Sequence, residues 1–396
     1  MTEQALYDLS PALRLMLMGL TVALGPLAWV WLRSRHAPLP HRLRMLTLVT
    51  LFLTFDLVLF GAFTRLTDSG LGCPDWPGCY GNASPLGAHA DITQAQAAMP
   101  TGPVTHPKAW IEMIHRYLAT GVGVLILTLT IVTWFARRQA RKLRESAALS
   151  AAGRTAERTS DLLQPWWPTL TLIWVCLQGA FGALTVTMKL FPAIVTMHLL
   201  GGMVLLAFLR AQSVRFAVVA GDVRVVAVPR STWLLLLVGF VLLWMQIALG
   251  GWVSTNYAVL ACTEFPSCQG SFWPNMDFRL GFTLWRELGA GHGDANFTFE
   301  ALTAIHYVHR LTAYLVFAVL LLLARQLYRA PGMRTHARWI LALVLLQLVT
   351  GVSNVVLGWP MLAAVSHTGG AAALVVVLTG ALFSCRHTAQ PDLRQN

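Results

Sequence analysis

Charged residues are scarce in this chain of 396 residues. Asp, Glu, Lys and Arg together make up 12% of it and only 17 residues are acidic, whereas 56% are apolar and the mean hydropathy is +0.59. This composition excludes an ordinary water-soluble globular protein, in which about a quarter of the residues carry charge. The sequence therefore predicts an all-α polytopic membrane protein.

The N-terminus lacks the basic leader and the small-residue cleavage pattern of a signal peptide. Its first apolar stretch is long and ends in WLRSRH, so we expect a true spanning helix. The short loops and the lack of a transit peptide favour a bacterial inner membrane. A spanning helix needs about 20 mainly apolar residues, and we predict nine of them, at 12–33, 44–64, 109–135, 166–187, 192–214, 232–253, 301–324, 337–357 and 361–384.

Lysine and arginine are unevenly distributed among the predicted loops. The loops 33–45, 137–164, 210–230 and 325–338 hold four to seven each, whereas the long loops 65–108 and 254–300 hold two each. Because cytoplasmic loops retain positive charge, the long loops are predicted to face the periplasm. The N-terminus is then periplasmic and the C-terminus cytoplasmic. The net charge of +12 is positive-inside bias, and no nucleic-acid partner is implied.

Cysteine is also rare, with six in the chain, and four of them form two C-x5-C pairs in the long loops. Disulfides persist on the oxidising face of a membrane, so we predict Cys73–Cys79 and Cys262–Cys268. Each disulfide either staples its loop or takes part in redox chemistry, and the second role suits the first pair better. No histidines stand at ligand spacing beside these thiols, which disfavours a zinc site.

The chain repeats itself internally. One stretch, GAFTRLTDSGLGCPDWPGC (61–79), aligns with GGWVSTNYAVLACTEFPSC (250–268), and IEMIHRYLA (111–119) aligns with IHYVHRLTA (305–313). A third, QGAFGALTV (178–186), aligns with QLVTGVSNV (347–355). The repeat gives each half two matched histidines at membrane depth, His115 and His198 in the first and His309 and His367 in the second.

Ionisable side chains at that depth are costly and usually functional. Two histidines from facing helices of a bundle are a natural pair of axial ligands for haem iron. The alternative for any one of them is a buried neutral histidine bonded to a neighbouring helix. For the matched four, the sequence favours two bis-histidine haem sites.

Arginine follows the first histidine of each half, at Arg116 and Arg310. These side chains either reach haem propionates or extend to the periplasmic surface. Only the first half has a carboxylate beside its histidine, because Glu112 is replaced by His306 in the second. We interpret Glu112 as a base, a proton relay or a stabiliser of positive charge; the alternative is an interfacial glutamate bonded to Arg116 or a backbone group. Asp56, in the second span, has no assigned role.

The motifs together resemble those of the heme A synthase family, over about residues 60–385. They are TRLTDSGLGCPDWPGCYG (64–81), EMIHRYLA (112–119), HLLGG (198–202), IHYVHR (305–310) and SHTGG (366–370). The resemblance implies oxidation of the C8 methyl group of haem O to a formyl by successive hydroxylations, which gives haem A for cytochrome oxidase. It also implies two pseudosymmetric four-helix bundles, here 44–215 and 232–385. The remaining segments are an extra N-terminal helix with its linker (1–43), a cytoplasmic linker (216–231) and a tail (386–396).

Residue by residue, the resemblance places haem O between His115 and His198 with Glu112 as the catalytic carboxylate. It places haem b between His309 and His367. Since bis-histidine ligation leaves the iron no open position, either one histidine dissociates during turnover or the iron relays electrons while water supplies the oxygen.

Other partners expected of such an enzyme are membrane lipid, an electron donor, a haem O synthase, an oxidase assembly factor and a second copy of the chain. A di-haem electron-transfer cytochrome would use the same four histidines but would not need Glu112. A repeat-built transporter is a weaker alternative, because the two halves enter the membrane with the same orientation.

Overall fold

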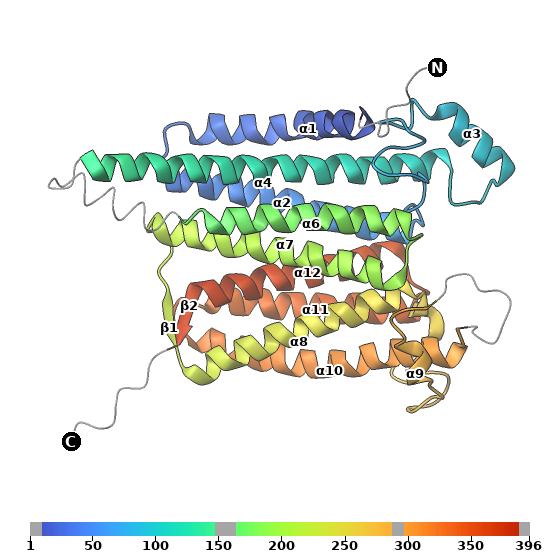
Figure 1. Cartoon of the computed structure of the whole chain (residues 1–396). Helices are drawn as coiled ribbons and strands as arrows, with labels where there is room; N and C mark the ends of the chain where they lie inside the picture. The colour runs from blue at the N-terminus through green and yellow to red at the C-terminus, as the bar shows by residue number, and fades with distance from the viewer. Residues whose placement is uncertain (1–9, 147–163, 287–296, 388–396) are drawn as a thin grey trace, which may run out of the picture. The chain divides into compact units, whose positions relative to one another are not determined.

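The protein is described here from a computed structural model, which covers residues 10–146, 164–286 and 297–387. Within these ranges nine helices are long and apolar enough to cross a membrane, which confirms the nine predicted spans. Three segments lie outside the described residues. They are 147–163 of the predicted loop 137–164, 287–296 of the predicted loop 254–300, and 388–396 of the predicted tail. The nine helices, seen in Figure 1, are α1 (Ser10–Ser34), α2 (Leu39–Leu66), α4 (His106–Ser146), α6 (Trp166–Thr187), α7 (Pro192–Val219), α8 (Arg230–Thr255), α10 (Phe299–Arg329), α11 (Arg334–Val356) and α12 (Met361–Ser384).

Smaller elements lie between the spans. The outer loops contain α3 (His89–Ala98), the 3-10 helix η1 (Ala258–Ala261) and α9 (Phe278–Gly281), none of which the hydropathy predicted. Two short strands, β1 (Val226–Val228) and β2 (Cys385–His387), pair in parallel with Val226 opposite Cys385. Burial raises the pKa of the Cys385 thiol to about 11, so it stays protonated at neutral pH.

Local sequence explains where several helices begin. Proline immediately precedes α2, α8 and α12, as Pro38, Pro229 and Pro360. Proline suits a helix start, where its missing N–H removes no helical hydrogen bond and its fixed φ matches the helix. At the start of α10, the Thr298 hydroxyl accepts from the backbone N–H of Ala301 at 3.2 Å, which caps one of the unsatisfied donors.

The contacts divide the chain into two compact units. Unit 1 is Met1–Leu190 with Arg215–Asp222, and unit 2 is Phe191–Val214 with Val223–Asn396. The C-terminal end of α7, from Arg215, is therefore counted with unit 1 and the rest of that helix with unit 2. This division does not decide the bundle ranges 44–215 and 232–385, which stay a prediction.

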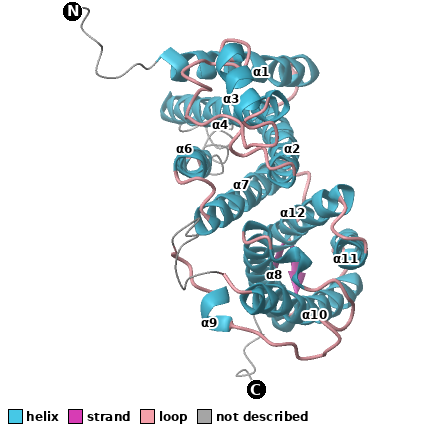
Figure 2. Cartoon of the chain, turned by 90° about the vertical axis from the view of Figure 1, so that its right-hand side faces the viewer, coloured by secondary structure: helices cyan, strands magenta, loops and turns pink. Residues whose placement is uncertain are grey.

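Helix α4 is the centre of unit 1, where it contacts α1, α2 and α6 (Figure 2). Small residues bring α1 close to it: a Cβ on Gly19 would overlap Thr120, and one on Gly121 would lie 2.9 Å from Val22. Close approach at small residues is the usual way in which helices pack in a membrane. The extra N-terminal helix is thus packed on the helix that carries Glu112 and His115.

In unit 2, α8 packs on α10, α10 on α11, α11 on α12 and α12 on α8, so these four helices close a ring (Figure 2). Fully buried leucines of α8, α10 and α12 fill it, among them Leu236, Leu323 and Leu378. The outer part of α7 touches α8, where the Thr196 and Thr255 hydroxyls are 3.1 Å apart. The ring places the second-half histidines on opposite helices, His309 on α10 and His367 on α12.

Candidate functional site

Both predicted disulfides are present. Cys73 bonds Cys79 in unit 1 and Cys262 bonds Cys268 in unit 2, each with a Cα–Cα distance of 4.9 Å. All four cysteines are fully buried. We call the segments 73–82 and 262–271 the first and second disulfide loops.

An acidic side chain inside each disulfide loop binds the backbone that turns back over it. Asp75 accepts hydrogen bonds from the N–H groups of Tyr80 at 2.6 Å and Gly81 at 2.8 Å. In the second loop Glu264, which the repeat aligns with Asp75, accepts from the N–H of Gly270 at 3.0 Å. Burial, together with Asp91 and Asp75, raises the pKa of Tyr80 above its usual value. The duplication thus extends from the sequence to the hydrogen bonds of the two loops.

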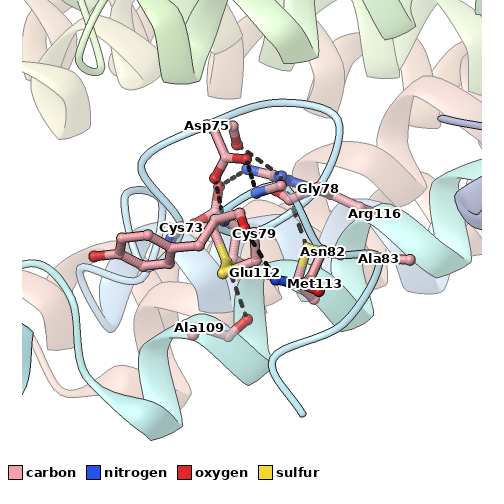
Figure 3. The surroundings of a disulfide bond; sticks show 12 residues. Cys73, Asp75, Gly78, Cys79, Asn82, Ala83, Ala109, Glu112, Met113 and Arg116 are labelled. Carbon is pink, nitrogen blue, oxygen red and sulfur yellow. Dashed lines mark hydrogen bonds and ion pairs between the residues drawn. A yellow bond between two sulfur atoms is a disulfide. The ribbon is translucent and has the colours of Figure 1, made fainter. Parts of the chain in front are cut away.

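Arg116 and Arg310 hold these loops against the helices below them. Each arginine is 8% exposed. Arg116 donates to the carbonyl oxygens of Asp75 at 3.0 Å, Pro77 at 3.1 Å and Gly78, as Figure 3 shows. Arg310 donates to Ser267 O at 3.1 Å and Cys262 O at 3.0 Å. The structure therefore places both guanidinium groups on loop carbonyls, and their predicted contact with haem propionates stays a prediction.

Glu112 lies beneath the first disulfide loop and is 4% exposed. Its Oε2 accepts a hydrogen bond from the backbone N–H of Cys73 at 2.8 Å, and its Oε1 forms an ion pair with Nη2 of Arg116 (Figure 3). Both carboxylate oxygens are therefore held in fixed positions, one by the disulfide loop and one by α4 itself. These are the arginine and backbone partners that the alternative interpretation of Glu112 named. They fix its orientation one helical turn from His115.

The second half has no such carboxylate. His306 takes the place of Glu112 and is buried, 4% exposed. The loop is instead bound to α10 through Gln269, whose Nε2 donates to Oγ1 of Thr303 at 2.8 Å and to Ala261 O at 3.2 Å. The two halves therefore differ both in the residue beside the first histidine and in the side chain that binds the disulfide loop to its helix.

A glycine on a neighbouring helix faces three of the four matched histidines. A Cβ on Gly61 would lie 3.1 Å from Cε1 of His115, and one on Gly250 would lie 3.0 Å from Cε1 of His309. A Cβ on Gly351 would lie 3.3 Å from Cε1 of His367. Any larger residue would press on the imidazole at these positions. The repeat aligns Gly61 with Gly250, so the close contact between a glycine and the ring recurs in both halves.

The second-half histidines have further polar neighbours. Gln246 on α8 and Thr350 on α11 each lie within hydrogen-bond distance of an imidazole Nδ1, that of His309 and His367 respectively. The sequence analysis overlooked Gln246 and Thr350, although each stands within one helical turn of a glycine that faces a histidine.

The first-half histidines belong to different compact units, His115 on α4 in unit 1 and His198 on α7 in unit 2. His115 stacks on Phe60, with ring centroids 6.2 Å apart. The pairing of His115 with His198 stays a prediction. Asp56 lies exposed on α2, and the structure gives it no role.

Among the described residues, no three His, Cys, Asp or Glu side chains gather as a metal-binding group. The donor set of unit 2 is instead two imidazoles on opposite helices of the ring, each packed closely against a glycine. Two nitrogen donors from opposite helices fit axial ligation of a planar macrocycle better than a bare tetrahedral ion.

A family model described as cytochrome oxidase assembly protein, COX15-CtaA, matches residues 44–379. The chain belongs to the COX15-CtaA family. Among its curated relatives, a protein of Shewanella oneidensis named heme A synthase is 37% identical over 342 residues, which is 85% of this chain and 94% of the relative. One of the same name from Mesorhizobium japonicum is 31% identical over 345 residues, covering 81% and 84% of the two chains. A third, from Allorhizobium ampelinum, is 29% identical over 365 residues, covering 87% and 89%.

Family membership agrees with the nine spans. Multiple apolar helices and bacterial relatives of nearly equal length together indicate a multi-pass protein of a bacterial inner membrane. The family model begins at residue 44, so the COX15-CtaA match does not include α1. The structure accounts for that helix by its packing on α4.

Proposed function

We propose that this chain is a heme A synthase, which oxidises the C8 methyl group of haem O to a formyl and so supplies haem A to cytochrome oxidase. The observation that carries the proposal is the buried carboxylate of Glu112, held between Cys73 N–H and Arg116 one turn from His115. Family membership and the curated relatives named heme A synthase support it.

In this proposal His115 and His198 bind the substrate haem O, as the repeat and the family indicate. Oxidation of the methyl group breaks C–H bonds at the edge of the macrocycle, and the protons released there must be taken up. A carboxylate beside the substrate can accept a proton or stabilise positive charge there. Hydrogen bonds from Cys73 N–H and Arg116 orient both oxygens of Glu112 and so fix the position of this carboxylate.

His309 and His367 would bind the second haem, haem b, in unit 2. When bound, haem b supplies a one-electron redox centre. The residues of this half hold and orient it, and no carboxylate stands at the position of Glu112. The proposed topology, with the disulfide loops and the N-terminus in the periplasm, keeps the cysteines on the oxidising side. An electron donor, a haem O synthase and an oxidase assembly factor are the proposed partners.

The test is to express the full chain in a bacterium that makes haem O but no haem A, and to analyse the extracted haems by chromatography with mass detection. Haem A, or its hydroxylated intermediate, is the expected product. If a folded, haem-loaded protein yields only haem B and unmodified haem O with electron donors present, a di-haem cytochrome replaces the synthase as the better interpretation.

The glycine beside His309 gives a prediction for the second haem site. Replacing Gly250 by alanine places a methyl group 3.0 Å from Cε1 of His309, so the ring must turn. Such overpacking costs about 1–3 kcal/mol, which corresponds to haem binding weakened roughly ten-fold or more. The measurement is the ratio of haem to protein in the purified variant.

Gly239→Ala is the matched control, because it lies on the same helix α8 and its added Cβ would meet Leu320 at an ordinary 3.4 Å. We expect this variant to keep the haem content of the parent protein. Equal haem content in the two variants would contradict the view that haem binding depends on the close packing of the His309 ring against Gly250.

A further inference from the structure

Gln246 and Thr350 are polar side chains inside spanning helices, and the proposed reaction uses neither. We propose that they are positioning residues for the second haem site, which fix the imidazoles of His309 and His367 and tune the haem that these bind. This inference rests on the proposed function, because it takes His309 and His367 as haem ligands.

The hydrogen bonds of Thr350 determine which nitrogen of His367 carries the proton. The single O–H of Thr350 donates to the carbonyl oxygen of Leu346 at 2.7 Å, one turn earlier in α11. Its Oγ1 is also 3.0 Å from Nδ1 of His367, and with the hydroxyl proton already used, Oγ1 acts there as acceptor. Nδ1 therefore carries the proton, and Nε2 keeps the lone pair that a ligand to iron requires.

Helix α11 also binds the backbone of the same histidine. Nε2 of Gln347 donates to the carbonyl oxygen of His367 at 2.9 Å. A Cβ at Gly370 would overlap this amide, so glycine leaves the room that the contact needs. His367 is thus held at its ring by Thr350 and at its carbonyl by Gln347, and rotation of the imidazole is restricted.

Gln246 holds His309 by a different set of contacts, because its amide nitrogen only donates. Its Nε2 lies 3.1 Å from Nδ1 of the ring and 3.0 Å from the carbonyl oxygen of the same residue. The other end of the amide, Oε1, accepts from Thr312 at 2.7 Å. The side chain of Gln246 on α8 therefore contacts the ring of His309, the backbone of His309 and the hydroxyl of Thr312, all on α10.

The repeat places apolar residues at both aligned positions of the first half. Leu57 corresponds to Gln246 and Phe181 to Thr350, and neither side chain has a hydrogen-bonding group. The same two contacts cannot form from these positions, so they belong to the half that is proposed to keep a resident haem. At His367, a hydrogen bond from Nδ1–H to Thr350 orients the ligand imidazole and raises its basicity. Greater basicity favours the ferric over the ferrous iron and lowers the reduction potential.

The test compares Thr350→Val and Gln246→Leu with the parent protein, purified at full length with its haems. We expect Thr350→Val to raise the reduction potential of one haem, measured by redox titration, because it removes the acceptor of Nδ1–H. We also expect haem transfer to apomyoglobin to become roughly ten-fold faster, since loss of such a partner typically weakens binding by that order.

Two variants separate positioning from a general structural effect. Thr350→Ser keeps the hydroxyl and should restore both the potential and the rate of haem loss. Thr368→Val removes a hydroxyl beside His367 that binds only its own helix, at Ala364 O, and should behave as the parent. The same two readouts for Thr350→Ser and Thr350→Val would overturn the inference.

Replacing the two histidines separately tests the haem site itself, apart from the positioning role of Gln246 and Thr350. His309→Ala and His367→Ala should each cost the protein one haem. If neither does, the proposed haem site is wrong. If both do, but Thr350→Val and Gln246→Leu keep the parent's potential and rate of haem loss, the site stands and the positioning role is wrong.

Discussion

Replacing Glu112 by glutamine is expected to lower haem A formation by about 100-fold, because a positioned acid–base group contributes on that order. An amide keeps the shape of the side chain, and its oxygen can still accept from Cys73 N–H, but it takes up no proton and carries no charge. Arg116 keeps its carbonyl partners Asp75, Pro77 and Gly78. We therefore expect the variant to fold and to bind haem. The measurement is the yield of haem A per bound haem.

The control is the same substitution at Glu300, which is exposed in the first turn of α10 and lies in the half without the catalytic carboxylate. This variant should make haem A at the parent's rate. Unchanged product in Glu112→Gln would mean that the carboxylate only anchors the first disulfide loop, which is the alternative that its hydrogen bonds also allow.

The second large effect is expected from the disulfide loops, which fold alike but are connected differently. Removing either disulfide, as Cys73→Ser with Cys79→Ser or as Cys262→Ser with Cys268→Ser, should cost about 2 kcal/mol of stability for loops this short. Of the four disulfide cysteines, Cys73 is the one whose backbone N–H donates to Glu112. We expect the first double variant to lose roughly ten-fold more haem A formation than the second, because misplacing a catalytic group costs rate beyond stability.

The two double variants are compared for product yield and for haem content at a temperature where both remain folded. Each therefore controls for the loss of a staple in the other. Equal losses of product would contradict a special role for the first loop and leave both disulfides as staples of equal weight.

Much of the fold could be predicted because a membrane simplifies the problem. Spans must be long and apolar, so hydropathy alone located the nine long helices of the described residues. The predicted bounds of α6 and α12 agree with the structure to the residue. The duplication located both disulfides, since matched cysteines close in sequence have few other partners. Helices of the outer loops, α3 and α9, were not predicted because they are short and their hydropathy is weak.

The arginines show the limit of such reasoning. The sequence placed Arg116 and Arg310 next to the histidines, but it did not give the direction of their side chains. Each guanidinium carries five donors on a flexible stem. Its partners are the nearest acceptors, and these turned out to be carbonyl oxygens of loops that lie about 40 residues away in sequence, such as Pro77 and Ser267.

The sequence by itself determined that this protein spans a membrane nine times, that its core is duplicated, and which histidines and cysteines are matched between the halves. These properties follow from composition, periodicity and alignment, which are properties of the chain read in order. Only the tertiary structure decided that Glu112 is bound by Cys73, that α1 packs on α4, and that Thr350 lies within hydrogen-bond distance of His367. Those contacts depend on which helices are neighbours and how far each is rotated, and that is set by close packing of small residues such as Gly19 and Gly370 across helices that no local pattern relates.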